Sequence, residues 1–106
     1  MNTFVITGRV SSPVRIELGM LDDRVQRTGT FTVYTAPPKK IKHDRTGHAG
    51  NNLRITVTER YAQTLMQILS LRDPVSITGH LQANHDGIPQ IIAVRVEKLD
   101  ALPCAP

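Results

Sequence analysis

Apolar and polar side chains alternate along several short stretches of the chain. Between residues 52 and 58, the apolar residues Leu53, Ile55 and Val57 are separated by polar ones. A period of two is typical of a strand with one face buried. Four further stretches share this period: residues 4–10, 30–35, 75–81 and 92–96. The pattern therefore predicts five strands.

The spacing of apolar residues changes between the third and the fourth of these strands. The apolar positions there are i, i+4, i+7 and i+8, namely Tyr61, Leu65, Ile68 and Leu69. This spacing puts them on one face of a short helix, which we expect to pack on the strands. The helix should end before Asp73, because the residue preceding a proline is disfavoured in the α region.

Alternation also assigns side chains to the two faces of each strand. The residues expected to point inward are Phe31 and Val33 in the second strand and Ile92, Val94 and Val96 in the fifth. The residues expected to point outward from the second strand are Thr30, Thr32 and Tyr34. Gly8 and Gly79 lie in mid-strand, where the strands of a small barrel bend.

The segments between the strands carry weaker signals. The first strand is interrupted at residues 11–13 and is expected to resume at residues 14–16 after a bend. Residues 17–27 have no period, and we expect a loop there. Residues 36–51 form a long connection of the kind that is usually functional or mobile. Residues 84–87 contain Asp-Gly, which indicates a turn.

The predicted order is three strands, one helix and two strands. This is the order of the OB-fold, a five-stranded Greek-key barrel with one α-helix between strands 3 and 4. We therefore expect an all-β (mainly β) domain built from antiparallel strands over residues 1–100. Residues 101–106 are expected to form a short flexible C-terminal tail. A sandwich or an SH3-like barrel is the alternative, although a helix of this length is unusual there.

The composition is that of an ordinary globular domain. Hydrophobic residues make up 40% and charged residues 21% of the chain, and the formal net charge is +4. No apolar run approaches the roughly 20 residues of a membrane span, and the N-terminus does not resemble a signal peptide. Cys104 is the only cysteine, so no internal disulfide can form. We expect a cytoplasmic protein without a membrane partner.

Positive charge is concentrated in the long connection. Four cations fall within seven residues: Lys39, Lys40, Lys42 and Arg45. In an OB-fold such loops border the binding face, where cations can follow a phosphate backbone. The alternative is a solvated loop whose lysines only keep the protein soluble.

The ordered set of strand motifs resembles the bacterial single-stranded DNA-binding protein (SSB) family, including its shorter relative, primosomal replication protein N (PriB). Residues 2–10 are similar to the family's opening strand with its glycine. Residues 53–57 resemble its third strand, in which an arginine opens an apolar run, and residues 62–71 resemble its helix. The most specific match is VSITGHL at residues 75–81, which follows the pattern V-x-I-x-G-x-L. The resemblance covers residues 2–99.

The resemblance implies binding of single-stranded DNA by a homo-oligomer, either a dimer or a tetramer, without a cofactor. A first strand that is apolar on both faces also favours a subunit contact, although the 17–27 loop could cover one face instead. Two departures accompany the resemblance. The chain has no Trp, and positions where the family stacks bases on aromatic rings hold Lys39, Asn52 and Thr58. The family's acidic tail peptide is also absent, which favours a PriB-like role.

Nine residues are candidates for contact with nucleic acid. Four are the cations of the long connection, and the other five lie in strands: Arg9, Arg15, Tyr34, Arg54 and His80. Tyr34 is the best candidate for stacking on a base, and its alternative role is packing on a neighbouring strand or subunit. Arg54 offers both a charge and a planar surface, and its alternative role is a cross-strand ion pair.

Other kinds of site are poorly supported. The four histidines have no Cys-x-x-Cys pair beside them, so we expect no metal site. No catalytic constellation is recognisable, so we expect no enzyme.

The sequence thus predicts sequence-tolerant single-stranded DNA binding in DNA replication, recombination or repair, with replication or recombination proteins as further partners. The first alternative is a PriB-like replication-restart accessory that binds single-stranded DNA and a helicase complex. The second is an OB-fold protein-interaction module without nucleic-acid binding, which the aromatic content of only 4% favours.

Overall fold

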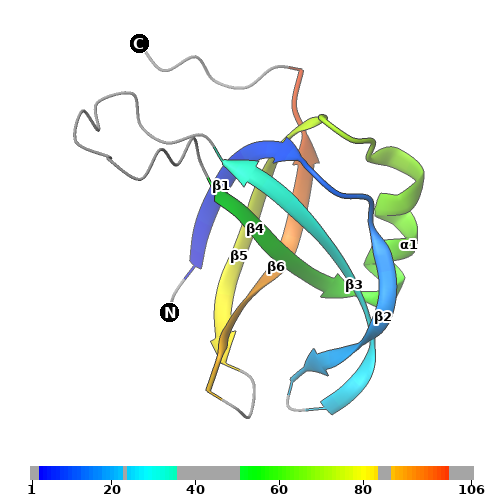
Figure 1. Cartoon of the computed structure of the whole chain (residues 1–106), viewed down its shortest axis with the longest axis vertical. Helices are drawn as coiled ribbons and strands as arrows, with labels where there is room; N and C mark the ends of the chain where they lie inside the picture. The colour runs from blue at the N-terminus through cyan, green and yellow to red at the C-terminus, as the bar shows by residue number, and fades with distance from the viewer. Residues whose placement is uncertain (1–2, 23, 36–50, 84–86, 101–106) are drawn as a thin grey trace, which may run out of the picture.

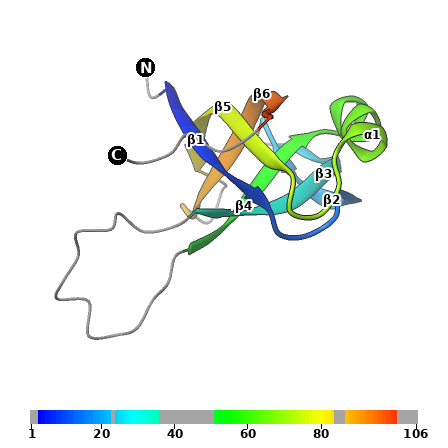
Figure 2. The ribbon, with the colours of Figure 1, turned by 90° about the horizontal axis from the view of Figure 1, so that it is seen from above.

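The chain forms a closed β-barrel with a helix at one end (Figures 1 and 2). The computed structural model describes residues 3–22, 24–35, 51–83 and 87–100. Its elements are β1 (Thr3–Val10), β2 (Arg15–Leu21), β3 (Arg24–Thr35), β4 (Asn51–Thr58), α1 (Glu59–Ile68), β5 (Pro74–Ala83) and β6 (Pro89–Lys98). The strand order is β1-β5-β6-β4-β3-β2, and an additional pairing of β1 with β3 closes the barrel. The mainly β class and the position of the helix are as predicted.

The predicted first strand is divided into β1 and β2. The chain leaves the sheet between Val10 and Arg15 and bends there, as the sequence indicated. Both halves then run along β3, because Val10 pairs with Val33 and Arg15 pairs with Thr30. The described residues therefore form six strands where five were expected.

One pairing in the barrel is parallel, which corrects the expectation of an antiparallel set. β4 and β6 run in the same direction where they pair. Between these strands the chain passes through α1 and then β5, and this long connection brings it back to the end at which β4 began. The other described pairings are antiparallel.

Residues 17–27, expected to be a loop, belong to a β-hairpin. β2 stays paired with β3 as far as Leu21 and Arg24, so backbone hydrogen bonds define the hairpin. Leu18 and Val25 are 72% and 68% exposed, whereas Leu21 is 4% exposed, so its apolar residues are not all on one buried face. Apolar residues that are divided between buried and exposed positions leave no regular period in the sequence, which explains the wrong prediction.

The core lies inside the barrel and beneath α1. Six apolar side chains from β3, β4 and β5 are at most 1% exposed: Phe31, Val33, Ile55, Val57, Val75 and Ile77. The inward assignment of Phe31 and Val33 is thereby confirmed. Ile92 and Val96 of β6 are buried as well, as predicted.

Helix α1 closes one end of the barrel. Its N-terminus is capped by Thr58, whose Oγ1 accepts a hydrogen bond from a backbone N–H of the first turn at 3.2 Å. Ala62 and Leu65 are fully buried, and Leu69 is partly buried against the core. Ile68, predicted to be buried, is 48% exposed. Ile68 is the last residue of the helix, so its side chain lies at the end of the apolar face.

A β-bulge in β6 changes the face of one predicted core residue. Thr78 pairs with Arg95, but the next residue, Gly79, pairs with Ala93, so Val94 is the extra residue. Val94 is 61% exposed instead of pointing inward, while Ala93 is 5% exposed. At Gly79 a Cβ would lie only 2.3 Å from a carbonyl oxygen of β6, so the close approach of the two strands requires glycine.

Candidate nucleic-acid interface

Outward-facing residues of β2, β3 and β4 form one continuous surface. Arg15 lies opposite Thr30, and Thr30 in turn lies opposite Thr56. Two residues further along β3, on the same face, Thr32 lies opposite Arg54. Side chains alternate between the faces of a strand, so these five residues share the face that points away from the core.

Two adjoining hollows lie on this surface. The first, of about 340 Å³, lies beside the bend between β1 and β2. The second, of about 480 Å³, lies between the β2–β3 hairpin and the start of β6. Thr30 and Arg54 line both, so the hollows adjoin each other. We call this the sheet groove, and its other lining residues are Ser12, Pro13, Arg15, Glu17, Gly19, Met20, Thr28, Phe31, Thr32, Thr56, Ile88, Pro89, Gln90 and Ile91.

Threonines form the floor of the sheet groove. Thr28, Thr30 and Thr56 are 1%, 9% and 5% exposed. Thr30, which was expected to point outward, does lie on the outer face by register but is buried there. Its Oγ1 donates a hydrogen bond to Glu17 Oε1 at 3.0 Å, which covers it with the glutamate side chain.

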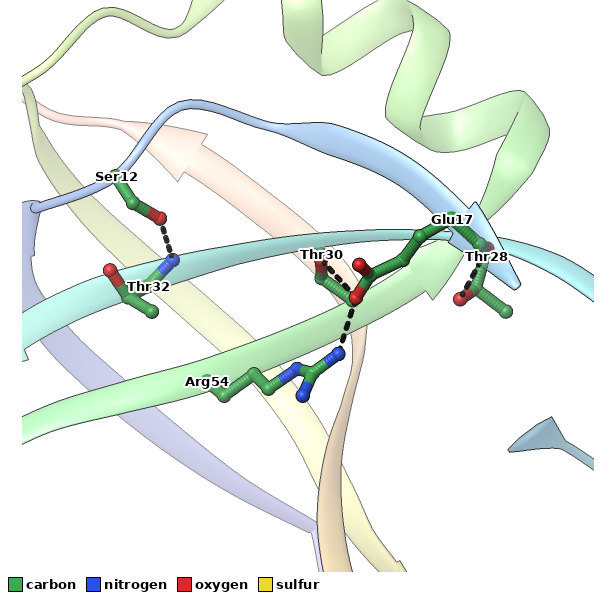
Figure 3. A network of polar contacts seen from close by, with 6 residues as sticks. All are labelled: Ser12, Glu17, Thr28, Thr30, Thr32 and Arg54. Carbon is green, nitrogen blue, oxygen red and sulfur yellow. Dashed lines mark hydrogen bonds and ion pairs between the residues drawn. The ribbon is translucent and has the colours of Figure 1, made fainter. Parts of the chain in front are cut away.

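An ion pair crosses the middle of the sheet groove (Figure 3). Arg54 Nη2 on β4 contacts Glu17 Oε1 on β2, above the intervening strand β3. The two side chains are 68% and 42% exposed. The cross-strand ion pair that the sequence left open for Arg54 is therefore present, and it compensates the charge of this arginine.

The sheet groove continues toward the β1–β2 bend. There the Ser12 hydroxyl accepts a hydrogen bond from the backbone N–H of Thr32 at 2.9 Å, and the hydroxyls of Ser11 and Thr32 lie 2.7 Å apart. Arg15 lies in this part of the groove, is exposed, and makes no ion pair with any residue that the structure describes.

The other strand candidates lie beyond the sheet groove. Tyr34 is half-buried and lies opposite Arg9 on one side and Asn52 on the other. Arg9 donates a hydrogen bond from Nη1 to the backbone oxygen of Arg72 at 2.9 Å, which directs it toward the connection between α1 and β5. His80 pairs with a residue of β1 on another side of the barrel. The structure therefore brings Arg15 and Arg54 together and leaves His80 apart.

The remaining predicted contacts cannot be placed on this surface. Lys39, Lys40, Lys42 and Arg45 lie outside the described residues, as does the predicted tail at residues 101–106. Of the positions where the SSB family has stacking aromatics, Asn52 is exposed and Thr58 caps α1.

Sequence reasoning missed two components of the sheet groove. Glu17 was assigned to a loop, although it holds the central ion pair. The threonine floor was visible in part, because Thr28, Thr30 and Thr32 alternate along one face of β3. The apolar part of the groove comes from Met20 and from residues 88–91, a combination that only the fold brings together.

Two negative findings apply to the described part of the chain. No group of three or more His, Cys, Asp or Glu side chains there could hold a metal ion. No helix within it has the length and apolar character needed to cross a membrane.

Comparison with known proteins identifies the fold. No family model matches the chain, and no curated protein matches it. Its structure is similar to the SSB domain of a Synechococcus sp. protein, with a TM-score of 0.63 and 20% identity over 91% of this chain and 93% of that one. It is also similar to a mitochondrial single-stranded DNA binding protein from S. cerevisiae, with a TM-score of 0.68 and 14% identity over 92% and 94%. The chain thus has the OB-fold of SSB domains.

Proposed function

We propose that this protein binds single-stranded DNA with little dependence on sequence and is not an enzyme. The observation that carries the proposal is the sheet groove, which two arginines line on the face where OB-folds bind nucleic acid. The solved proteins with this fold, described as SSB or single-stranded DNA binding proteins, support it.

The groove suggests how binding occurs without tryptophan. Phe31 contributes to the lining but is 1% exposed, so it offers no ring for stacking. Bases instead contact the aliphatic surface of Met20, Ile88 and Pro89. Phosphates are neutralised by Arg15 and by the lysines of the long connection, with release of counterions.

A homo-oligomer is part of the proposal. Along β1, residues 3–8 pair with β5 on one edge, while the β1–β3 pairing is confined to Arg9 and Val10. Val5 on this strand is 63% exposed. An apolar side chain beside a strand edge that has few pairing partners among the described residues is suited to contact with another subunit. We further propose a role in DNA replication, recombination or repair and, because of the single cysteine, a cytoplasmic location.

The second candidate function is a protein-interaction module. Two observations favour it: Glu17 compensates Arg54, and the one aromatic residue lining the groove is buried. Such a module would not bind oligo(dT) at low salt. A PriB-like role keeps DNA binding and adds contact with a helicase complex. Only a search for that partner distinguishes it from the proposed function.

Fluorescence anisotropy with labelled oligo(dT) tests the proposal. The Arg15→Ala variant should bind more weakly, and the slope of log affinity against log salt should become shallower by about 0.7, the value for one phosphate on a single strand. Arg60→Ala is the matched control, because Arg60 is exposed on α1 and outside the sheet groove. No binding by the parent protein at low salt would favour the interaction module.

A further inference from the structure

Glu17 lies in the sheet groove where a polyanion is proposed to bind. Three charged residues line the groove within the described part of the chain: Arg15, Glu17 and Arg54. Glu17 is the one anion among them, and its side chain is 42% exposed. A negative charge here repels a phosphate. It also pairs with Arg54, the cation that the phosphate would otherwise contact.

The carboxylate is held in the groove from two sides. Thr30 donates a hydrogen bond to Glu17 Oε1 at 3.0 Å, and Arg54 contacts the same oxygen (Figure 3). Thr30 is 9% exposed and belongs to the central strand β3, so its hydroxyl is a fixed anchor. Glu17 is therefore oriented over the middle of the groove.

We propose that Glu17 competes with the DNA backbone for Arg54 and thereby lowers both the affinity and the number of phosphates neutralised. This inference rests on the proposed function. It assigns the role of a competitor to Glu17, a residue that was not among the predicted DNA contacts. While the ion pair stands, Arg54 cannot neutralise a phosphate. Arg15 is unaffected, because it has no ion-pair partner among the described residues.

The Glu17→Gln variant tests this competition in anisotropy titrations with oligo(dT) over a range of salt concentrations. An exposed ion pair is weak, so the variant should bind about two- to five-fold more tightly at low salt. Its log-log salt slope should become steeper by about 0.7, because Arg54 becomes free to neutralise one further phosphate. The amide can still accept the hydrogen bond from Thr30, and thermal unfolding checks that the variant is folded.

The structure supplies a matched control for the loss of charge. Glu97 pairs with Arg95 at 2.8 Å on β6, with side chains 49% and 68% exposed, nearly the same as in the groove pair. Neither residue lines the sheet groove. Glu97→Gln changes the net charge of the protein equally, and its salt slope should equal that of the parent.

A double variant determines whether the effect depends on Arg54. In an Arg54→Ala background, Glu17→Gln should leave the salt slope unchanged, because no cation is released. An equal steepening in that background would overturn the proposal in favour of a general charge effect.

Two other results also overturn it. One is an unchanged slope in folded Glu17→Gln. The other is weaker binding of the variant, with the greatest loss for oligo(dC). The amino group of cytosine can donate a hydrogen bond to a carboxylate, so this result would make Glu17 a base contact. A parent that does not bind oligo(dT) at low salt overturns the proposed function and this inference with it. A parent that binds, with Glu17→Gln identical to it, overturns this inference alone.

Discussion

The hydroxyl of Tyr61 lies 2.7 Å from the backbone nitrogen of Val96, from which it accepts a hydrogen bond. The same hydroxyl lies 3.4 Å from the Val96 carbonyl oxygen, to which it can donate. The parallel pairing of β4 with β6 extends only to Thr56 and Ile92. Beyond that point, the side chain of Tyr61 supplies the hydrogen bonds that a neighbouring strand would otherwise provide.

Tyr61→Phe should destabilise the protein by about 1–3 kcal/mol, because it leaves a buried backbone N–H without its acceptor. Chemical denaturation measures the change. Gln63→Ala, at an exposed position of the same helix, is the control and should change the free energy of unfolding by less than about 0.5 kcal/mol. Equal stability of the two variants would contradict a structural role for the hydroxyl.

Two apolar positions of α1 should respond differently to truncation. Leu65 is fully buried in the core, so Leu65→Ala should cost about 2–5 kcal/mol. Ile68 is 48% exposed, so Ile68→Ala should cost much less. The denaturation midpoint of each variant checks this prediction, and similar losses at both positions would contradict the placement of the helix.

The lysines of the long connection should contribute through charge alone. Replacing Lys39, Lys40 and Lys42 together by alanine should make the log-log salt slope for oligo(dT) shallower by about 2. Each phosphate neutralised on a single strand contributes about 0.7 to this slope. The change should be the same for oligo(dC), because phosphates carry no sequence information. A salt slope equal to that of the parent would indicate a solvated loop that does not contact DNA.

Tyr34 should contribute through its ring. Tyr34→Ala is expected to weaken binding to oligo(dT) by about 1–3 kcal/mol, the range for base stacking, and to leave the salt slope nearly unchanged. Tyr34→Phe keeps the ring and should retain most of the affinity. If Tyr34→Ala binds normally, the binding surface ends at the sheet groove and does not reach the row of Arg9, Tyr34 and Asn52.

Asp73 should make stability depend on pH in the acid range. The backbone N–H of Ser70 donates to Asp73 Oδ2 at 2.8 Å and lowers the pKa of the carboxyl, burial opposes this, and Lys98 Nζ at 3.3 Å lowers it further. A lowered folded pKa means that the stabilisation is complete above the ordinary Asp pKa of about 4 and is lost as pH falls through the folded value.

Denaturation at a series of pH values, from about 6 into the acid range, tests this dependence. The parent should lose stability on acidification more steeply than Asp73→Asn. Glu97→Gln, which removes a carboxylate from the exposed pair on β6, serves as the comparison. Parallel curves for the parent and Asp73→Asn would contradict a role for Asp73.

The sequence predicted best where burial is one-sided. Phe31, Val33, Ile55 and Val57 alternate with polar residues because one face of β3 and of β4 packs into the barrel. The helix was recognisable for the same reason, since Leu65 lies at the centre of its apolar face.

The errors have local physical causes. The β2–β3 hairpin is defined by backbone hydrogen bonds, and its Leu18 and Val25 are exposed, so hydrophobic alternation could not reveal it. Val94 kept the predicted period but lies in a bulge, which depends on the register between β5 and β6.

The candidate site was only partly predictable. Arg15 and Arg54 were identified from their types and alternation, and both line the sheet groove. Their electrostatic setting was not predictable, because Glu17 meets Arg54 only after β2, β3 and β4 have paired. A residue type suggests a contact, whereas its neighbours in the fold decide how much of its charge remains available.

The pairing of β1 with β5 determines when the barrel can close. Thr3 pairs with His80, so the first strand can complete its pairing only with residues that are distant in the sequence. Contacts between such distant segments slow folding, because a long loop must be ordered before they form. During synthesis, the β3–β4 pairing can form while β5 is still inside the ribosome. We therefore expect β1 to pair with β5 late, in a folding reaction slower than that of a helical protein of similar size.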